Sequence, residues 1–272
     1  MIDSRFRVAP PPVDMALSPL DVTVSYWLMG ICTVFVLIAL AFALREWQRC
    51  KSPVLLLLVI GGGITNLAEP FVDLVGACWH PIINNPTLFE HMDRPMPVWL
   101  VFAYFAYFGA LMMCLYHAFS KGTSTKAMWL WFIIPIIADV ILEESLLGAS
   151  NGLYAYYGNQ PLRFNVFPAW WAPANTAGIY MSAVLMTLFV PHLRGWKLAL
   201  VPFSTLLCYA AASGVVSFPA AVVINSEFPN WATQLGGVGC FVIAALIVKG
   251  CTLLIASDSP FNVRKAFAPR SA

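Results

Sequence analysis

Residues 61–81 read GGGITNLAEPFVDLVGACWHP, an apolar stretch that carries two acidic side chains, Glu69 and Asp73. An acid at the centre of a membrane helix costs about 2.5–3.5 kcal/mol on insertion scales, so such residues usually face a bundle interior or a watery cavity. The spacing i, i+4, i+7 and i+11 continues from the two acids to Gly76 and His80, which predicts one polar helix face. We therefore expect a site along this face, with open space at Gly76.

Pro70 lies within the same expected helix and has no backbone N–H. The carbonyl of Asn66 therefore loses its usual amide partner, and the helix is predicted to kink where the acids begin. The freed carbonyl would add a further acceptor to the site.

The composition of the chain is that of a membrane protein. Of 272 residues, 60% are hydrophobic and only 10% are charged, and the mean hydropathy is +0.77. This is too little charge to cover a water-soluble globule of this size, so we expect a multi-pass protein of the cytoplasmic (plasma) membrane, in contact with lipid. A net charge of +2 without a basic stripe argues against nucleic acid as a partner. The sequence indicates no particular protein partner.

Several motifs of metal and cofactor chemistry are missing from the chain. Its seven cysteines are scattered through apolar runs with no CxxC pair, which favours packing roles. His80 and His91 could be metal ligands together with Glu69 and Asp73, since imidazoles and carboxylates suit iron or zinc. No HxxxH or ExxH spacing is present, however, and His80 before Pro81 at a helix end favours capping or interfacial hydrogen bonding. No phosphate-binding GK[ST] follows the glycines at 61–63, and no DDxxD, GxSxG or HExxH is present. We predict no metal and no cofactor, and hydride, phosphoryl and serine-nucleophile chemistry are disfavoured.

Seven apolar runs reach the roughly 20 residues that a membrane-spanning helix needs. The predicted fold is an all-α, polytopic transmembrane bundle of seven helices, with residues 23–255 as the membrane domain. Residues 1–22 form a polar segment without the pattern of a cleaved signal peptide, and residues 256–272 form a cytoplasmic tail. The runs are 23–44, 53–78, 97–120, 127–149, 169–190, 198–223 and 231–255.

Lys and Arg flank these runs unevenly, which predicts an N-terminus outside and a C-terminus in the cytoplasm. Both acidic runs would then carry their acids in the outer half, beside two long outer loops at residues 79–96 and 150–168. Ten basic residues lie on the inner side: Arg45, Arg49, Lys51, Lys121, Lys126, Arg194, Lys197, Arg264, Lys265 and Arg270. Four lie on the outer side: Arg5, Arg7, Arg94 and Arg163.

The fourth run carries Asp139 and Glu143 four residues apart, while Glu144 points about 100° away from Glu143. Two carboxylates held close in a poorly solvated site cannot both ionise easily, so a neutral acid can persist beside a charged base. This arrangement favours proton transfer. The alternative is that the acids pair with Arg94, Arg163 or backbone amides and lock the bundle.

Aromatic residues near the outer ends of the runs are typical of an interfacial belt. The cluster at residues 152–171 could instead floor a pocket that holds an apolar substrate and stabilises a passing cation. Asn175 would then hydrogen-bond the substrate or the fourth run, although helix packing explains it equally well. The candidate binding residues are Trp79, His80, Tyr157, Gln160, Trp170, Trp171 and Asn175.

Four segments in order carry a family resemblance. They are EPFVDLVGACWHP at 69–81, MPVWLVFAYFAYFG at 96–109, DVILEE at 139–144 and YYGNQPLRFNVFPAWWAPAN at 156–175. Together they resemble the AveC-like membrane proteins of actinomycetes, whose founding members act as spiroketal-forming cyclases in macrolide biosynthesis. The likeness runs from about residue 53 to residue 229, and His80 stands where the family pattern has tyrosine.

The resemblance implies a spirocyclase-type cyclase or dehydratase that forms a spiroketal or related cyclic ether in a lipophilic, polyketide-like substrate. Closing a dihydroxy-ketone requires an acid at the carbonyl or departing hydroxyl and a base at the attacking hydroxyl, through an oxocarbenium-like cation. Water must be excluded. We expect the rings of Tyr157 and Trp171 against the cation. The predicted catalytic residues are Glu69, Asp73, Asp139 and Glu143.

Three other functions are compatible with membrane carboxylates. A proton-initiated membrane terpene cyclase relies on them, and a proton-coupled transporter uses them naturally. A transporter would need a polar path through the inner half, where the acidic runs are apolar at residues 53–60 and 127–137. An inert scaffold for a biosynthetic complex would tolerate Glu69→Gln and Asp73→Asn without loss of product.

Overall fold

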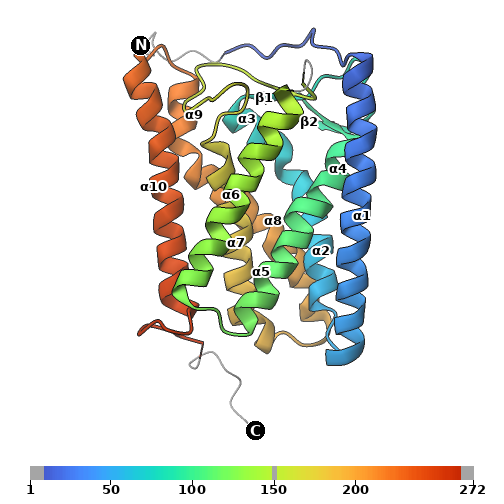
Figure 1. The fold of residues 1–272 in the computed structure, drawn as a ribbon, viewed down its shortest axis with the longest axis vertical. Coiled ribbons are helices and arrows are strands. Elements are labelled where there is room, and N and C mark those ends of the chain that lie inside the picture. The colour runs from blue at the N-terminus through green and yellow to red at the C-terminus, as the bar shows by residue number, and fades with distance from the viewer. Residues whose placement is uncertain (1–8, 149–151, 265–272) are drawn as a thin grey trace.

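The computed structural model describes residues 9–148 and 152–264, and it is a bundle of helices with short strands at one end (Figure 1). Within these residues, six helical spans are long and apolar enough to cross a membrane. The expected all-α, membrane-type bundle is therefore confirmed. The six spans are Pro19–Cys50, Val54–Gly76, Val98–Ser120, Trp171–His192, Gly195–Val216 and Asn230–Ile255.

Several spans contain more than one helical element. 3-10 turns cover Thr65–Ala68, Val190–His192 and Gly195–Ala199, and a π-helical segment covers Phe105–Ala110. The α-helices are α1 Pro19–Cys50, α2 Val54–Ile64, α3 Glu69–Gly76, α4 Val98–Tyr104, α5 Leu111–Ser120, α6 Thr125–Gly148, α7 Trp171–Phe189, α8 Leu200–Val216, α9 Phe218–Ile224 and α10 Asn230–Ile255.

The fourth expected run corresponds to α6, a helix of 24 residues that packs on α7 and α10 (Figure 1). The count of seven spans and the orientation with the N-terminus outside remain predictions. Some residues used for them lie outside the described part of the chain: Ala149, Arg5, Arg7, Lys265 and Arg270.

α1 begins at Pro19, before the expected residue 23, because Ser18 caps it. The Ser18 N–H donates to the Asp21 carboxylate at 2.8 Å, and the Asp21 N–H donates to the Ser18 hydroxyl at 3.2 Å. This reciprocal pair is a capping box, and proline suits the first helical position because no partner is needed for a backbone N–H there.

The helix that carries the first acids changes its winding at Thr65–Ala68, directly before Pro70. The Asn66 carbonyl does lose its i+4 partner, as expected. It is not free, however, because the Glu69 N–H donates to it in the tighter i+3 pattern of the 3-10 turn. The predicted extra acceptor is therefore wrong.

α3 ends at Gly76, so His80 does not lie on the helix face predicted for it. Ala77 adopts a left-handed conformation with φ of +52°, and its N–H donates to the carbonyl of Asp73. The predicted open space at Gly76 is also wrong. A Cβ there would lie 1.6 Å from the Trp171 ring, so the indole fills the position.

Two short strand pairs lie at one end of the bundle (Figure 1). β1, Cys78–Trp79, pairs antiparallel with β4, Ala155–Tyr156, and Cys78 stands opposite Tyr156. β2, Thr87–His91, pairs with β3, Arg94–Pro97. Because β1 and β4 belong to the two long loops, those loops lie together where α3 ends and α7 begins.

α7 lies in the centre of the bundle, where it packs on α5, α6, α8 and α10 with nearly all of its residues buried. α1 lies at the edge (Figure 1) and exposes more than half of Ile31, Phe35 and Ile38. An apolar outward face of this length suits hydrocarbon rather than water.

α2 and the π-helical segment touch through glycine. A Cβ on Gly62 would lie 2.1 Å from the Cα of Gly109. Small residues at helix crossings let two backbones approach closely, which is common in membrane bundles. The contact fixes the segment that follows Tyr104 against the helix that leads to Glu69.

Candidate functional site

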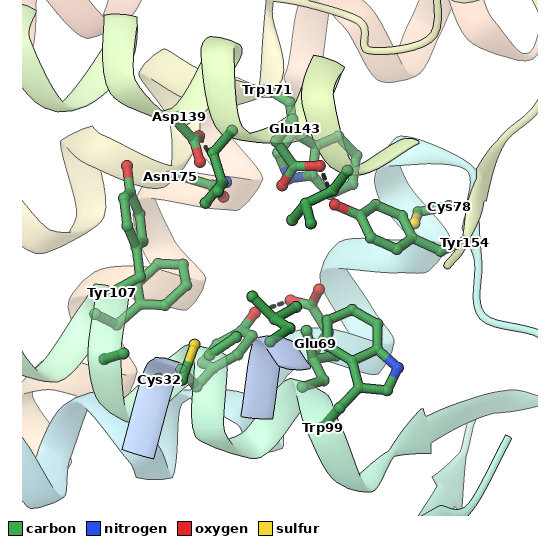
Figure 2. Close-up of a pocket in the computed structure, with 18 of the residues that line it drawn as sticks. Cys32, Glu69, Cys78, Trp99, Tyr107, Asp139, Glu143, Tyr154, Trp171 and Asn175 are labelled. Atoms are coloured by element: carbon green, nitrogen blue, oxygen red, sulfur yellow. Dashed lines mark hydrogen bonds between the residues drawn. The ribbon is translucent and has the colours of Figure 1, made fainter. Parts of the chain in front are cut away.

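A cavity of about 290 Å³ lies in the half of the bundle nearest the strands, and three carboxylates line it. Glu69 is the first residue of α3, and Asp139 and Glu143 lie one turn apart on α6. Figure 2 shows Glu69 on one side of the cavity and the two α6 acids on the other. Aromatic rings form much of the remaining wall: Trp99, Tyr104, Tyr107, Phe108, Tyr154, Tyr156, Trp171 and Tyr209.

The two α6 acids are each held through one carboxylate oxygen. The Tyr154 hydroxyl donates to Oε2 of Glu143, and Nδ2 of Asn175 donates to Oδ2 of Asp139 across 3.4 Å. Their other oxygens have no hydrogen-bond partner among residues 9–148 and 152–264. No ion pair of these acids with Lys or Arg occurs among those residues either. The α6 acids are therefore oriented by neutral donors and keep one oxygen for a ligand.

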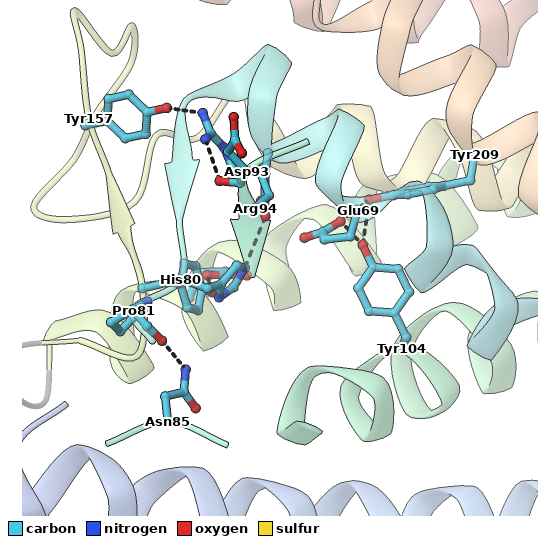
Figure 3. Close-up of polar contacts among 12 residues, drawn as sticks. Glu69, His80, Pro81, Asn85, Asp93, Arg94, Tyr104, Tyr157 and Tyr209 are labelled. Atoms are coloured by element: carbon cyan, nitrogen blue, oxygen red, sulfur yellow. Dashed lines mark hydrogen bonds and ion pairs between the residues drawn. The ribbon is translucent and has the colours of Figure 1, made fainter. Parts of the chain in front are cut away.

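Glu69 is oriented in the same way by two phenols (Figure 3). Tyr104 donates to its Oε2. The Tyr209 hydroxyl lies 3.1 Å from that oxygen and 2.9 Å from the Tyr104 hydroxyl. All three side chains are buried, so this network holds the carboxylate in one position with its second oxygen available to the cavity.

Asp73, the fourth predicted acid, is fully buried and does not line the cavity. Its Oδ2 lies 3.6 Å from Nε2 of His80, and the Cys78 sulfur lies close to both, with the three ligand atoms within 4.8 Å of one another. Neither oxygen of Asp73 nor either ring nitrogen of His80 has an N–H or O–H hydrogen bond to a described residue. Burial lowers the pKa of His80 to about 3, so its imidazole is neutral. These three residues could hold a metal ion, which the sequence did not predict.

Three of the predicted binding residues, His80, Trp171 and Asn175, line the cavity. The other four, Trp79, Tyr157, Gln160 and Trp170, are not among the residues that line it.

Trp79 and Tyr157 both contact Arg94 instead, and Figure 3 shows Tyr157 beside the Arg94 guanidinium. Nη2 of Arg94 donates to the Tyr157 hydroxyl at 2.6 Å, and the guanidinium carbon lies 5.5 Å from the centre of the Trp79 ring. Both aromatic residues therefore contact a buried cation in the loops.

Gln160 and Trp170 tie the second long loop to α3. Nε2 of Gln160 donates to the Gly76 carbonyl at 2.8 Å, and its Oε1 accepts from Nε1 of Trp170 at 3.1 Å. These bonds satisfy a carbonyl at the end of α3 and keep the loop beside the cavity.

Tyr154 and Tyr156 line the cavity, whereas Tyr157 does not. Both belong to the aromatic cluster expected at residues 152–171, although Tyr157 was the tyrosine of that cluster predicted to bind substrate. Alternation along β4 was the signal, because residues two apart in a strand share a face. Burial, followed by the charge of Glu143, raises the pKa of Tyr156 well above its usual value. Tyr156 therefore remains a neutral phenol that can donate a hydrogen bond.

The sequence contained no comparable signal for Tyr104 and Tyr209. They lie 105 positions apart and meet only through the packing of α4, α8 and the turn before α3. The π-helical segment after Tyr104 also changes the residue spacing of that helix, so a regular 3.6-residue period misplaces its faces.

Glu144 points away from the cavity and accepts from backbone amides. The N–H groups of Asn165, Val166 and Phe167 lie 3.2, 3.3 and 2.9 Å from its Oε1. For this acid, the alternative of pairing with backbone amides is correct.

We expect Glu144→Ala to lower the free energy of unfolding by about 2 kcal/mol, because partly buried amides lose a charged acceptor. Thermal unfolding in detergent measures the effect. Glu90→Ala is the control, since Glu90 is exposed on β2 and its side chain makes no hydrogen bond or ion pair with another described residue. Equal losses in the two variants would contradict the role given to Glu144.

The cavity opens sideways, toward the apolar outside of the bundle. Ile31 and Phe35 of α1 and Leu142 of α6 line the cavity and are also exposed on the outer surface. An apolar groove of about 420 Å³ adjoins it, shares Ala106 and Tyr107 with its wall, and follows α5 and the first half of α6.

Fold and site together define a class: a helical, membrane-type bundle with an acidic and aromatic cavity that opens toward lipid. Comparison with protein-family models, with curated proteins and with solved structures found no match.

Proposed function

We propose that the protein is a membrane cyclase or dehydratase that closes a lipophilic, polyketide-like substrate to a spiroketal or related cyclic ether. The observation that supports this most is the placement of Glu69 across one cavity from Asp139 and Glu143. Cyclisation needs a proton donor and a proton acceptor on different sides of one bound substrate. The resemblance to AveC-like spirocyclases supplies the reaction type.

The first ring closes by addition. A carboxylic acid on one wall gives its proton to the ketone oxygen while a substrate hydroxyl attacks the carbonyl carbon. A carboxylate on the facing wall takes the proton of that hydroxyl, and the product is a hemiketal. The free oxygens of the three acids are available for these transfers.

The second ring closes by dehydration. The hemiketal hydroxyl is protonated and leaves as water, which gives an oxocarbenium ion. The second substrate hydroxyl attacks this cation, and its proton goes to the remaining carboxylate. The substrate has lost one water, and both carboxyl groups have returned to their starting states. No carbon is oxidised or reduced overall, so the reaction needs no redox cofactor.

The aromatic wall supports this chemistry in two ways. Trp171 and Tyr156 present ring faces or edges beside the acids, and such rings stabilise a developing cation. The buried rings also exclude bulk water, which would otherwise capture the cation.

The lipophilic character of the substrate follows from the sideways opening. We expect Ile31→Trp to raise KM for a long-chain substrate about tenfold by narrowing the opening, with kcat little changed; tenfold corresponds to about 1.4 kcal/mol. Ile38→Trp is the control, because Ile38 is exposed on the same helix and does not line the cavity. An unchanged KM in Ile31→Trp would exclude entry past this residue.

Product analysis tests the reaction itself. Membranes containing the protein are incubated with a long-chain dihydroxy-ketone, and separately with a prenylated epoxide. The proposal predicts a product lighter than the ketone by one water, with one stereoisomer in excess. Conversion of the epoxide alone to a cyclic isomer would favour a proton-initiated terpene cyclase.

Transport is less well supported. A proton-coupled transporter needs polar groups through the other half of the bundle. The groove below the cavity is lined there by apolar side chains such as Leu130, Ile134 and Pro135. Uptake of either probe into sealed vesicles, without conversion, would reverse this conclusion.

A further inference from the structure

Asp73, Cys78 and His80 form a cluster that the acid and base chemistry does not use. Their side chains come from the end of α3 and from the β1 region, and they offer oxygen, sulfur and nitrogen. Each is at most 2% exposed. Carboxylate, thiolate and imidazole are the three ligand types that zinc takes in proteins.

The polar atoms of this cluster lack the partners that burial normally requires. Neither oxygen of Asp73 and neither ring nitrogen of His80 has an N–H or O–H hydrogen bond to a described residue. The Cys78 thiol, a weak donor, interacts with the Asp73 carboxylate. A buried carboxylate with so weak a partner is costly, and such groups call for an explanation. An ion bound between them would satisfy both side chains at once.

The spacing of the atoms fits a tetrahedral ion. Bonds of about 2.0–2.3 Å from a central zinc place neighbouring ligand atoms about 3.3–3.8 Å apart. Nε2 of His80 and Oδ2 of Asp73 are separated by 3.6 Å, which is long for a hydrogen bond and suitable for two ligands of one ion. One ligand atom from each of Asp73, Cys78 and His80 lies within 4.8 Å of the other two, so the three side chains are close enough to share one ion.

The local backbone is built to bring these residues together. Ala77, in the left-handed conformation with φ of +52°, turns the chain so that Cys78 returns toward Asp73. Pairing of Cys78 opposite Tyr156 then fixes the strand, and Gln160 bonds the carbonyl before the turn.

Two aromatic rings pack against the imidazole of His80. The His80 imidazole lies 5.0 Å from the Tyr154 ring and 5.8 Å from the Trp99 ring, measured between centroids. Such packing limits its rotation and keeps one nitrogen directed at Asp73. Rigid, supported ligands of this kind are characteristic of protein metal sites.

We propose that Asp73, Cys78 and His80 bind one divalent transition-metal ion, zinc by the chemistry of the ligands. A thiolate and a carboxylate balance the two positive charges, and the neutral imidazole completes three protein ligands. Cys78 and His80 line the cavity that also contains Glu69, so an ion held by the three residues would lie at the wall of that cavity. Three protein ligands with one open position are the pattern of catalytic rather than structural zinc. This inference is independent of the cyclase proposal.

The test is metal binding by the purified full-length protein in detergent, after removal of metals with a chelator. Cobalt(II) is the probe, because a cobalt–thiolate bond gives a near-ultraviolet charge-transfer band. We expect about one cobalt per chain, with that band, and displacement of cobalt by zinc. Cys78→Ser should remove the band and His80→Ala should weaken binding at least tenfold, whereas Cys240→Ser, at another buried cysteine, should change neither.

A second measurement uses only the unaltered chain, in case the variants do not fold. Zinc should slow alkylation of Cys78 at least tenfold, detected on its peptide by mass spectrometry, without slowing alkylation of exposed Cys114. No cobalt binding by the unaltered protein, binding without a thiolate band, or equal alkylation of Cys78 with and without zinc would each overturn the proposal. In that case the cluster is a metal-free group of buried polar side chains.

Discussion

Glu69→Gln is expected to reduce cyclisation by about 10²–10⁴-fold, the usual contribution of a positioned general acid or base. Glutamine has the same shape, and Tyr104 and Tyr209 can still donate to its amide oxygen, so the fold and the cavity should persist. Only the exchangeable carboxyl proton is lost. The measurement is the initial rate of product formation in membranes, normalised to the amount of protein.

Glu46→Gln is the matched control, because Glu46 lies on α1 and pairs with exposed Arg49. It should leave the rate unchanged. Asp139→Asn and Glu143→Gln should each cause losses comparable to that of Glu69→Gln, since they occupy the facing wall. If Glu69→Gln retained more than about a tenth of the rate, the catalytic role of Glu69 would be wrong and an inert scaffold would explain the data better.

Gly62→Ala is expected to have the largest effect on stability. The added methyl would lie 2.1 Å from backbone atoms of Gly109, and backbone cannot rotate away as a side chain can. Overpacking of a close contact usually costs about 1–3 kcal/mol, and we expect the upper end or beyond because two main chains must separate. Thermal unfolding in detergent, with the fraction of monodisperse protein, gives the comparison.

Gly30→Ala provides the control for this substitution. Gly30 lies within α1, where a Cβ would meet nothing within 4 Å. Replacing a glycine inside a helix by alanine gains up to about 1 kcal/mol of helix propensity, so Gly30→Ala should unfold at the same temperature or slightly higher. Equal unfolding temperatures for the two variants would mean that α2 and the π-helical segment do not approach as described.

The helical period predicted most of the acidic site. Asp139 and Glu143 lie one turn apart and line one cavity, and Glu69 lines the same cavity from another helix. The two acidic helices face one cavity because ionisable side chains are costly in lipid and therefore point toward the interior of a membrane bundle. The helical period also placed Asp73 on the face of Glu69, but Asp73 is buried and does not line the cavity.

Helix ends were harder to predict than helix faces. The spacing placed His80 on the helix of Glu69. That helix, α3, ends at Gly76, because the next residue, Ala77, adopts a left-handed conformation. Left-handed residues at helix ends are usually glycine or asparagine, so an alanine at position 77 did not indicate that the helix ends there. The same turn brings His80 back to Asp73 by a different route, through β1 rather than along the helix.

Contacts between residues far apart in the sequence could not be predicted from local patterns. Tyr209 reaches Glu69 across 140 positions, and no periodicity links them. Likewise, Gly76 is small because Trp171 occupies its space, and not because a ligand does. A single sequence indicates which residues need a buried polar environment, while the partners that supply it depend on how the helices pack.

Labelling of the unaltered protein by an apolar carbodiimide, such as dicyclohexylcarbodiimide, tests the shared, lipid-accessible cavity most directly. The reagent adds to a carboxylic acid and leaves a bulky acylurea, which would fill most of a cavity of about 290 Å³. We predict rapid labelling of Glu69, Asp139 or Glu143, with no more than one of the three labelled in any one molecule by intact mass and peptide analysis. Molecules that carry adducts on Glu69 and on an α6 acid together would contradict the account, because those acids would then lie in separate spaces.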